Sequence, residues 1–499
     1  MRLRQHGARP RVGRIALAAG LLVMYAAALR VTGQAPGGLG AQGARSTARD
    51  WAQDLPMKIT EPFALASVGD VIIVRPASQL ADPGLQSAIK VIRDADAGFG
   101  NFESLIRDEN TFEGPLGGSM VGTKEVAADL KAMGFTVMNR AGNHLMDSGP
   151  EGIFETVRLM DQAGLAYAGF GRNLDEARAP RFAETRKGRI GLVGMYSETG
   201  GAQSRLAATY RVGVTGGRPG LNSLNVTRAI AVSADHLSLL KKIKDAVYEH
   251  RAEYSNAVRP PAAEASGAVD FFGTTYKAGS RPGALTYAMN QRDLQENLRS
   301  IKNGKQYSDF MIATIHAHQG DTLMQAFLFE DRPPDFLIEL AHASIDNGAD
   351  AFVGHGPHIL RGIEIYKGKP IFYDLGEFFR EWDWSCDCNF SPDGDVTQAE
   401  RVVRGLEARG VVEPINYESA IAVSKFDKGQ LHEVRVYPIW ARHDGPLSRR
   451  GIPMMAPPAI AQRILARLQK LSEPFGTAIA IDGNVGVIRV SAQRSSAAP

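Results

Sequence analysis

The stretch "DAFVGHGPHILRGIEIYKGKPIFYDLGEFF", residues 350–379, places two histidines on a tight turn directly after an apolar run. The continuous apolar residues 351–353 predict a buried strand. His355 and His358 follow it, three positions apart, among glycines that let the backbone approach a bound ion closely. In open α/β sheets the ligand crevice lies at the carboxyl ends of the strands. The stretch therefore predicts an α/β sheet with a binding site at this end of its strands.

Outward from this stretch, apolar strand-like runs alternate with segments of helical spacing. The alternation predicts an α/β fold, with a sheet covered by helices on both faces. A hairpin is expected around residues 367–369, followed by a tail that mixes strands with a helix near 459–471. Further helices are expected at 85–95, 123–133, 149–163, 288–302 and 334–347.

Composition and the positions of glycine and proline divide the chain into four parts, of which residues 1–35 are the first. Residues 36–56 are rich in small and polar residues and predict a flexible linker. Residues 57–445 are expected to form the main domain, interrupted near 200–284 by a glycine- and proline-punctuated insertion. A last helix and strand within 446–499 are expected to pack on the same domain.

Residues 1–35 carry six arginines and no acid; five of the arginines precede the apolar segment 15–29, and small and polar residues follow it. This pattern predicts a secretory signal peptide or an N-terminal membrane anchor. Fifteen apolar residues fall short of the roughly 20 that span a bilayer, which favours a cleaved signal. Either alternative predicts a periplasmic, secreted or membrane-anchored protein facing outside the cytoplasm. There, Cys386 and Cys388 could form a strained bridge or a pair that faces a partner, and a local structural or incidental role is expected, since two thiolates alone make a poor zinc site.

The bulk composition excludes two classes of protein. The chain has 499 residues, 44% of them hydrophobic and 22% charged, which is ordinary for a globular protein and excludes wholesale disorder. Its formal charge is +3, and without the six arginines of residues 1–35 it would be −3. A nearly neutral remainder gives no electrostatic case for nucleic-acid binding.

Polar side chains follow five apolar runs, and five of the chain's eleven histidines are among them. Carboxylate, amide and imidazole together form the ligand set of Mn²⁺, Fe²⁺ or Zn²⁺, and the absence of cysteine argues against a structural zinc site. The sequence therefore predicts a divalent metal centre, without distinguishing these ions. The candidates at the strand ends are Asp70, Glu103, Asn143, His144, His316, His318, His355 and His358.

The order of the motifs "GD", "NFE", "GNHLMDSG", "IHAHQG", "GHGPH" and "YDLGEF" resembles the CapA family of capsule and poly-γ-glutamate biosynthesis proteins, from about residue 62 to 380. That family is similar in fold to the calcineurin-like metallophosphoesterases, which implies a layered β-sheet core with flanking helices. The most specific parts of the resemblance are "GNH" followed by Asp147, and the "GHGPH" turn before "YDLG".

The resemblance implies roles for individual residues. His144 matches the histidine that protonates a leaving group or steadies the transition state, and is the catalytic candidate. Asn101, His318 and Glu377 are expected around the metal ligands rather than among them. The implied metal ligands are Asp70, Glu103, Asn143, His316, His355 and His358.

Several assignments stay open on the sequence alone. Asp70 and Glu103 have ordinary alternatives, as a helix cap and a solvated loop acid. Asp147 is expected to be a structural turn residue, whereas Asp374 and Glu377 are each open between a structural and a functional role, and Glu377 would add a carboxylate ligand or base. Ile72 occupies the place of the histidine in the metallophosphoesterase Asp-x-His motif, which puts a full two-metal site in doubt.

Two classes of function follow from these patterns, with a variant of the first. One is an extracytoplasmic metal-dependent hydrolase or transferase acting on an anionic polymer or a phosphoester. The alternative is a non-catalytic assembly or binding component of a membrane-bound polymer synthesis and export complex. A free-standing phosphodiesterase or nucleotidase is the variant of the first class. None of these takes a nucleic acid as partner.

Overall fold

The computed structural model describes residues 56–116, 120–197, 206–252, 267–321, 330–381, 414–444 and 447–490. The expected signal or anchor at 1–35, nearly all of the linker at 36–56, and the pair Cys386 and Cys388 lie outside these residues. Among the helices of the described residues, none combines the length and the hydrophobicity that a membrane span requires.

The first of two large sheets carries the N-terminal part of the chain and the C-terminal strands. Its order is β23-β24-β21-β20-β1-β2-β5-β6, and β19 and β22 pair with β1 and β21. Strands β1, β2, β5 and β6 run parallel, whereas β20 pairs with β1 in the antiparallel sense. The bounds are β1 Phe63–Ile72, β2 Ala97–Phe102, β5 Val137–Asn139, β6 Ala166–Ala168, β19 Glu377–Arg380, β20 Glu418–Asp427, β21 Gln430–Ala441, β22 Pro453–Met455, β23 Ala480–Asp482 and β24 Val485–Arg489.

The second large sheet has the order β17-β18-β16-β15-β9-β8. Its central strands β9, β15, β16 and β18 are parallel, and the hairpin of β17 and β18 turns at Lys367 and Gly368, as the sequence predicts. The bounds are β8 Arg181–Thr185, β9 Gly188–Ser197, β15 Phe310–Ala317, β16 Ala351–His355, β17 Ile363–Tyr366 and β18 Lys369–Phe372.

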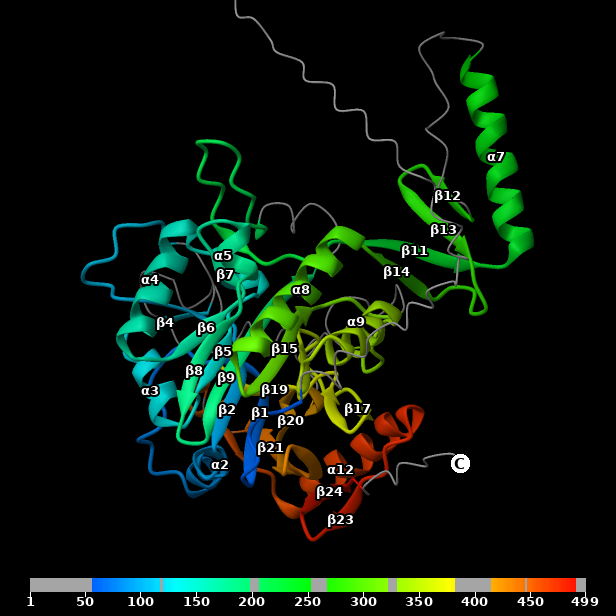
Figure 1. Ribbon diagram of the computed structural model, residues 1–499. Coiled ribbons are helices and arrows are strands. Elements are labelled where there is room, and N and C mark those ends of the chain that lie inside the picture. The colour runs from blue at the N-terminus through cyan, green and yellow to red at the C-terminus, as the bar shows by residue number, and fades with distance from the viewer. Residues whose placement is uncertain are drawn as a thin grey trace, which may run out of the picture. The chain divides into compact units, whose positions relative to one another are not determined.

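The two sheets pack face to face. One cluster of buried side chains joins Leu65 and Phe99 of the first sheet to Leu192, Ile312 and Val353 of the second. Helices cover both outer faces (Figure 1): α2 (Pro83–Arg93), α3 (Val126–Ala132) and α4 (Gly149–Gln162) over the first sheet, and α8 (Gln291–Tyr307) and α9 (Asp335–Asp346) over the second. The layered α/β core is thereby confirmed. The strands divide between two sheets, whereas the strand–helix alternation had indicated one.

Local sequence explains why these helices begin and face as they do. In α2 the carboxylate of Asp82 accepts hydrogen bonds from the backbone N–H groups of Gly84 and Leu85, which caps the first turn. The helix then buries Leu85, Ala88, Ile89 and Ile92, the spacing of a single helical face. Burying that stripe against the outer face of the first sheet fixes the orientation of α2.

The region expected to be an insertion forms a sheet of its own. Strands β11 (Val226–Val232), β12 (Ala268–Phe271), β13 (Thr274–Ala278) and β14 (Leu285–Met289) have the order β12-β13-β11-β14, accompanied by α7 (Ala234–Ala252). This small sheet is labelled beside α7 in Figure 1. Near its start, β10 (Gly220–Leu221) pairs with β7 (Phe170–Gly171), and α5 (Leu174–Arg178) follows β7.

The C-terminal part contributes to the main core. Helix α12 (Pro458–Ser472) buries Ala461, Ile464 and Leu468 in the cluster between the two sheets, and β24 pairs with β21. The remaining short elements are β3 (Leu105–Arg107), β4 (Val121–Thr123), and the 3-10 turns η1 (Asn143–Met146), η3 (Pro414–Tyr417), η4 (Leu447–Arg449) and η5 (Glu473–Phe475).

Candidate metal centre

Strand register in the first sheet places four polar residues in one row. Asp70 of β1 is paired with Glu377 of β19 on one side and with Asn101 of β2 on the other, and Asn101 is paired with Asn139 of β5. Residues paired across parallel strands share a level along the strands, so these four side chains belong to one end of the sheet. Strand β1 continues two residues beyond Asp70, with a register shift between Asp70 and Val71. The sequence had predicted that this strand ends at Asp70, which is wrong by two residues.

The second sheet supplies a matching row. His316 of β15 is paired with Tyr196 of β9 and with His355 of β16. His318 and His358 lie just beyond the ends of their strands. The turn that carries His358 is unusual: Gly356 has φ of 119° and His358 itself has φ of 61°, in the left-handed region that favours glycine. Strain of this kind at a non-glycine residue persists where the surrounding contacts hold it, often at functional sites.

Asp70 joins the two rows. Its Oδ1 accepts a hydrogen bond from Asn101 Nδ2 at 2.8 Å and lies 3.5 Å from His355 Nδ1. Its Oδ2 lies 3.1 Å from His358 Nδ1 and accepts a bond from the backbone N–H of Gly356 at 3.3 Å. The first-strand carboxylate and the paired histidines, almost three hundred residues apart in sequence, therefore meet in one buried site.

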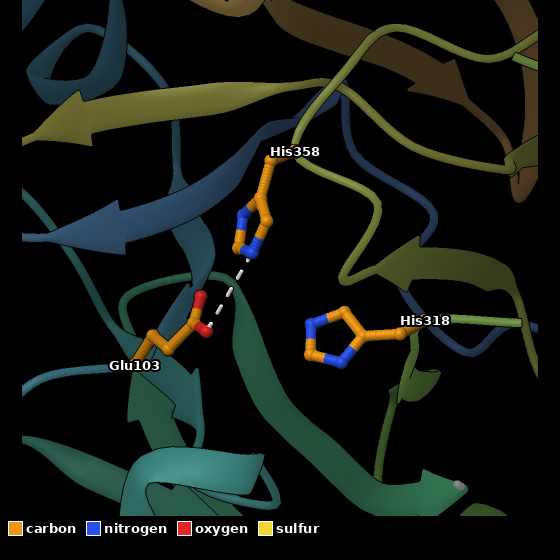
Figure 2. A group of neighbouring side chains, drawn as sticks. All are labelled: Glu103, His318 and His358. Carbon is orange, nitrogen blue, oxygen red and sulfur yellow. Dashed lines mark ion pairs between the residues drawn. The ribbon is translucent and has the colours of Figure 1, made fainter. Parts of the chain in front are cut away.

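Glu103 faces the same space from the end of β2. Its Oε1 lies 3.7 Å from His316 Nε2 and 4.0 Å from His358 Nε2. Figure 2 shows Glu103, His318 and His358 reaching toward one another from three separate segments, with the ion pair between Glu103 and His358 dashed. Ligand atoms within 4.8 Å of one another are offered by two groups that share Glu103: Glu103, His318 and His358, and Asp70, Glu103 and His316.

Burial shifts the pKa values of this cluster. It lowers the pKa of His316 to about 3 and that of His355 to about 4, so both rings are neutral near pH 7 and offer a lone pair. Burial raises the pKa of Glu103 well above its ordinary range. The nearby charge of His358 lowers this pKa, and the negative charge of Asp70 raises it further. Burial would lower the pKa of His358, but neighbouring carboxylates raise it well above the ordinary value.

Several buried polar atoms have no hydrogen-bond partner among the described residues. They include both carboxylate oxygens of Glu103, both ring nitrogens of His355 and Oδ1 of Asn143. An unsatisfied buried polar atom costs about 1–3 kcal/mol of folding free energy, so a cluster of such atoms destabilises the folded chain unless a ligand binds them. A divalent cation would satisfy such lone pairs and compensate the buried negative charge. The residues present therefore fit a divalent metal ion.

His144 and Asp147 form a pair at the edge of this site. His144 Nδ1 lies 2.7 Å from Asp147 Oδ2, and the His144 side chain is 27% exposed, unlike the buried histidines of the cluster. Both residues belong to the turn at η1, which begins at Asn143, four residues after β5 ends at Asn139. The sequence predicts Asn143 and His144 at the strand end itself; it does not reveal the turn between β5 and Asn143, because "RAG" continues the same motif without a clear break.

The remaining expected residues take clear places. Asn101 Nδ2 also lies 2.9 Å from His316 Nδ1, so this amide contacts a carboxylate and an imidazole of the cluster at once. His318 Nε2 lies 3.2 Å from His316 Nε2. Glu377 Oε1 lies 3.1 Å from His358 Nδ1, and its other oxygen accepts a hydrogen bond from Arg380.

Sequence reasoning missed two residues that support the site. Asn139 Nδ2 donates to Asn101 Oδ1 at 2.8 Å, which fixes the orientation of that amide. Arg140 donates to the backbone carbonyl oxygen of Ser104, at 2.8 Å, and to that of Phe102, so it holds the backbone on both sides of Glu103. Burial lowers the pKa of the Arg140 guanidinium to about 9. The only signal in the sequence was their place directly after an apolar run.

Ile72 stands where a metallophosphoesterase would carry a histidine, and its surroundings are apolar. It is 1% exposed and packs in a small cluster with Val74 and Met120. No ligand is therefore offered at that position, in agreement with the departure from the Asp-x-His motif noted in the sequence.

Comparison with known proteins assigns the family. Residues 64–381 match the model of the bacterial capsule synthesis protein family, PGA_cap. The uncharacterized protein y4sH of Sinorhizobium fredii (strain NBRC 101917 / NGR234) is 41% identical over 452 residues, covering 87% of this chain and 94% of that protein. The PGA biosynthesis protein CapA of Bacillus subtilis (strain 168) is 25% identical over 325 residues, covering 64% of this chain and 63% of that protein.

A solved structure titled "Putative 5'-Nucleotidase", from Staphylococcus aureus, aligns with 82% of this chain and 58% of its own chain. Its TM-score is 0.33 and its identity 10%, too low to carry an argument about fold or activity. The family match spans the strand ends that form the cluster, from Asp70 to Glu377. This chain therefore belongs to the bacterial capsule synthesis protein family PGA_cap.

Proposed function

We propose that this protein takes part in capsule or poly-γ-glutamate biosynthesis outside the cytoplasm, as a metal-dependent hydrolase or transferase acting on an anionic polymer or a phosphoester. The family and the name of the Bacillus subtilis relative support the biosynthetic context. The basic and apolar segment at residues 1–35 supports export, by a cleaved signal or an anchor.

The observation that carries the proposal is the buried cluster of carboxylates and neutral imidazoles with unsatisfied atoms. The residues that would hold Mn²⁺, Fe²⁺ or Zn²⁺ are Asp70, Glu103, Asn143, His316, His355 and His358. A divalent ion held there supplies Lewis-acid polarisation of a phosphoryl or carbonyl oxygen. For a poly-γ-glutamate substrate the corresponding bond is an isopeptide amide.

The chain's own side chains would divide the remaining work. Asn101 orients Asp70 and His316 by contacting both. Asp147 holds Nδ1 of His144, which leaves Nε2 of this partly exposed ring to meet a substrate and give a proton to the leaving group. The full burial of Asp70 and His316 keeps water away from the side chains that bear the charge, which strengthens their electrostatic interactions.

The test combines metal analysis with turnover. The protein purified without chelator should contain a divalent transition metal, and with Mn²⁺ it should cleave p-nitrophenyl phosphate esters or poly-γ-glutamate. The variant Glu109→Gln should keep both the metal and the turnover, since Glu109 is 60% exposed and pairs only with Arg107 among the described residues. Absence of both metal and turnover in the wild-type protein would refute the proposal.

A second candidate function is favoured by Ile72. Without a ligand at that position, the protein could serve as a non-catalytic component of a membrane-bound polymer synthesis complex that retains the fold. Complementation of a deletion strain separates the two functions. If His144→Ala and His355→Ala each restore full polymer production, the catalytic proposal fails and the assembly role gains support.

A further inference from the structure

A groove with a volume of about 880 Å³ lies outside the metal centre. Three parts of the chain line it: the end of α12 with η5, the residues that lead into α9, and the residues Arg281 and Asp321. Arg281 lies just before β14, and Asp321 lies just after β15. The volume is within the range of pockets that take small organic ligands, about 300–1,000 Å³. Nothing in the proposed chemistry uses this groove.

The groove carries four cations, Arg281, Arg332, Arg467 and Lys470. Arg281 is already engaged, because it contacts both carboxylate oxygens of Asp321 at 2.7 and 2.8 Å. Arg467 is mostly buried and lies 3.9 Å from Asp331, and its Nη1 has no hydrogen-bond partner in the described part of the chain. A guanidinium with donors to spare is suited to a carboxylate or a phosphate.

Arg332 and Lys470 are exposed cations of the same groove, and neither has an ion-pair partner among the residues that the structure describes. The groove is also lined by the carboxylates Asp321, Asp331 and Glu473 and by apolar side chains that include Leu471 and Phe475. Four cations and three carboxylates leave the groove a formal charge of only +1, which disfavours a dense multiple charge such as a phosphate. They suit a chain that alternates carboxylates with amide N–H donors and methylene groups.

The groove is close to the metal centre along two paths. Asp321 is three residues beyond His318, so their Cα atoms are at most roughly 11 Å apart. Arg361, three residues beyond His358, donates to the backbone carbonyl oxygens of Gln319, at 3.1 Å, and Glu330, at 2.9 Å. Its guanidinium therefore ties the segment that follows His318 to the segment that enters the groove.

From this arrangement we infer that the groove binds a flexible polycarboxylate chain of amide-linked residues, the chemistry of poly-γ-glutamate, and leads it toward the metal centre. This inference rests on the proposed function, of which it names the substrate class. Arg332 and Lys470 contact carboxylates at the mouth of the groove, Arg467 binds one inside it, and the apolar side chains contact the methylene groups.

The experiment measures binding of a fluorescein-labelled γ-glutamate hexamer to the full chain by anisotropy, at low and high ionic strength. The double variant Arg332→Gln/Lys470→Gln should bind about tenfold more weakly, since each lost surface charge contributes up to about 1 kcal/mol. The double variant Lys241→Gln/Lys242→Gln, which removes two exposed charges from α7, should bind like the wild type. Both pairs are on the surface, so thermal unfolding should be unchanged.

Three results would overturn the inference: no binding by the wild-type protein, equal binding by both double variants, or tighter binding of inorganic polyphosphate than of the γ-glutamate hexamer. Turnover of bis(p-nitrophenyl) phosphate, too small to need the groove, is measured on the same proteins. Absence of hexamer binding by the wild-type protein, with this turnover intact, contradicts the groove alone. Absence of metal and of all turnover, with hexamer binding intact, contradicts the proposed hydrolase.

Discussion

Glu103→Gln is the substitution that tests the metal centre most directly. Glu103 is 2% exposed, neither of its oxygens has a hydrogen-bond partner among the described residues, and it belongs to both groups of converging ligand atoms. Glutamine keeps the shape and removes the charge. Without metal, the variant should be as stable as the wild type or more stable, because Glu103 is fully buried and its burial disfavours the charged form of the carboxyl group.

With metal the order reverses. Loss of a supporting partner of a metal ligand costs 10–100-fold in affinity, so loss of a ligand itself should cost about 100-fold or more. At a metal concentration 100 times the wild-type Kd, binding adds about 2.7 kcal/mol to the stability of the wild type. The variant, with a Kd raised 100-fold, gains only about 0.4 kcal/mol.

The assay is chemical denaturation of both proteins in chelator and in Mn²⁺, with Glu109→Gln as the matched control. Glu109 is exposed, so its variant should gain as much from metal as the wild type. Equal metal-induced stabilisation of Glu103→Gln and the wild type would show that Glu103 does not bind the ion. The reasoning from its unsatisfied oxygens would then be wrong.

The remaining predictions concern proton transfer, pH and packing. His144→Ala should lower turnover of a phosphodiester by about 10²–10⁴-fold without changing metal content; equal turnover would exclude it as the proton donor. Burial lowers the folded-state pKa of His355 to about 4, so its contribution to stability is complete above about pH 6.5 and is lost as the pH falls toward 4. In chelator, the free energy of unfolding of the wild type should therefore fall relative to that of His355→Leu as the pH falls from about 6.5 to about 4. If denaturation gives the same pH dependence for both proteins, this prediction is contradicted. Gly69→Ala should cost about 3 kcal/mol or more, because its Cβ would lie 1.7 Å from the carbonyl oxygen of Gly376, whereas Gly142→Ala, with nothing within 4 Å, should be tolerated; denaturation midpoints compare the two.

Local sequence was sufficient to name residues that the structure brings together. Asp70, Glu103, His316, His355 and His358 each follow an apolar run, and the structure brings all five into one buried cluster. This convergence has a simple cause. A polar residue directly after a buried strand has few places to go other than the crevice at that edge of the sheet.

Asn143 remains a predicted ligand. Its side-chain oxygen is buried without a hydrogen-bond partner among the described residues, as expected of an atom held for a ligand. Asp147, expected to be a structural turn residue, contacts the ring of His144 and so positions the catalytic candidate. Neither relation is visible in the spacing "GNHLMD" alone, because that spacing does not fix which way the ring and the carboxylate point.

The sequence by itself determined the class of fold, most of the helices outside residues 200–284 and the set of side chains available at the strand ends. These properties depend on hydrophobic periodicity and on short-range turn chemistry, which a window of ten to twenty residues contains. The capping of α2 by Asp82 and the hairpin at residues 367–368 are of this local kind.

Only the tertiary structure decided how the strands divide between two sheets, which residues share a level across them, and which contacts satisfy each polar atom. The pairing of Asp70 with Glu377, the contact of Asp70 with His358 and the support of Glu103 by Arg140 join segments far apart in the chain or separated by a helix. These contacts are stabilised by packing and strand pairing that form only when the whole core assembles, so no local stretch of sequence predicts them.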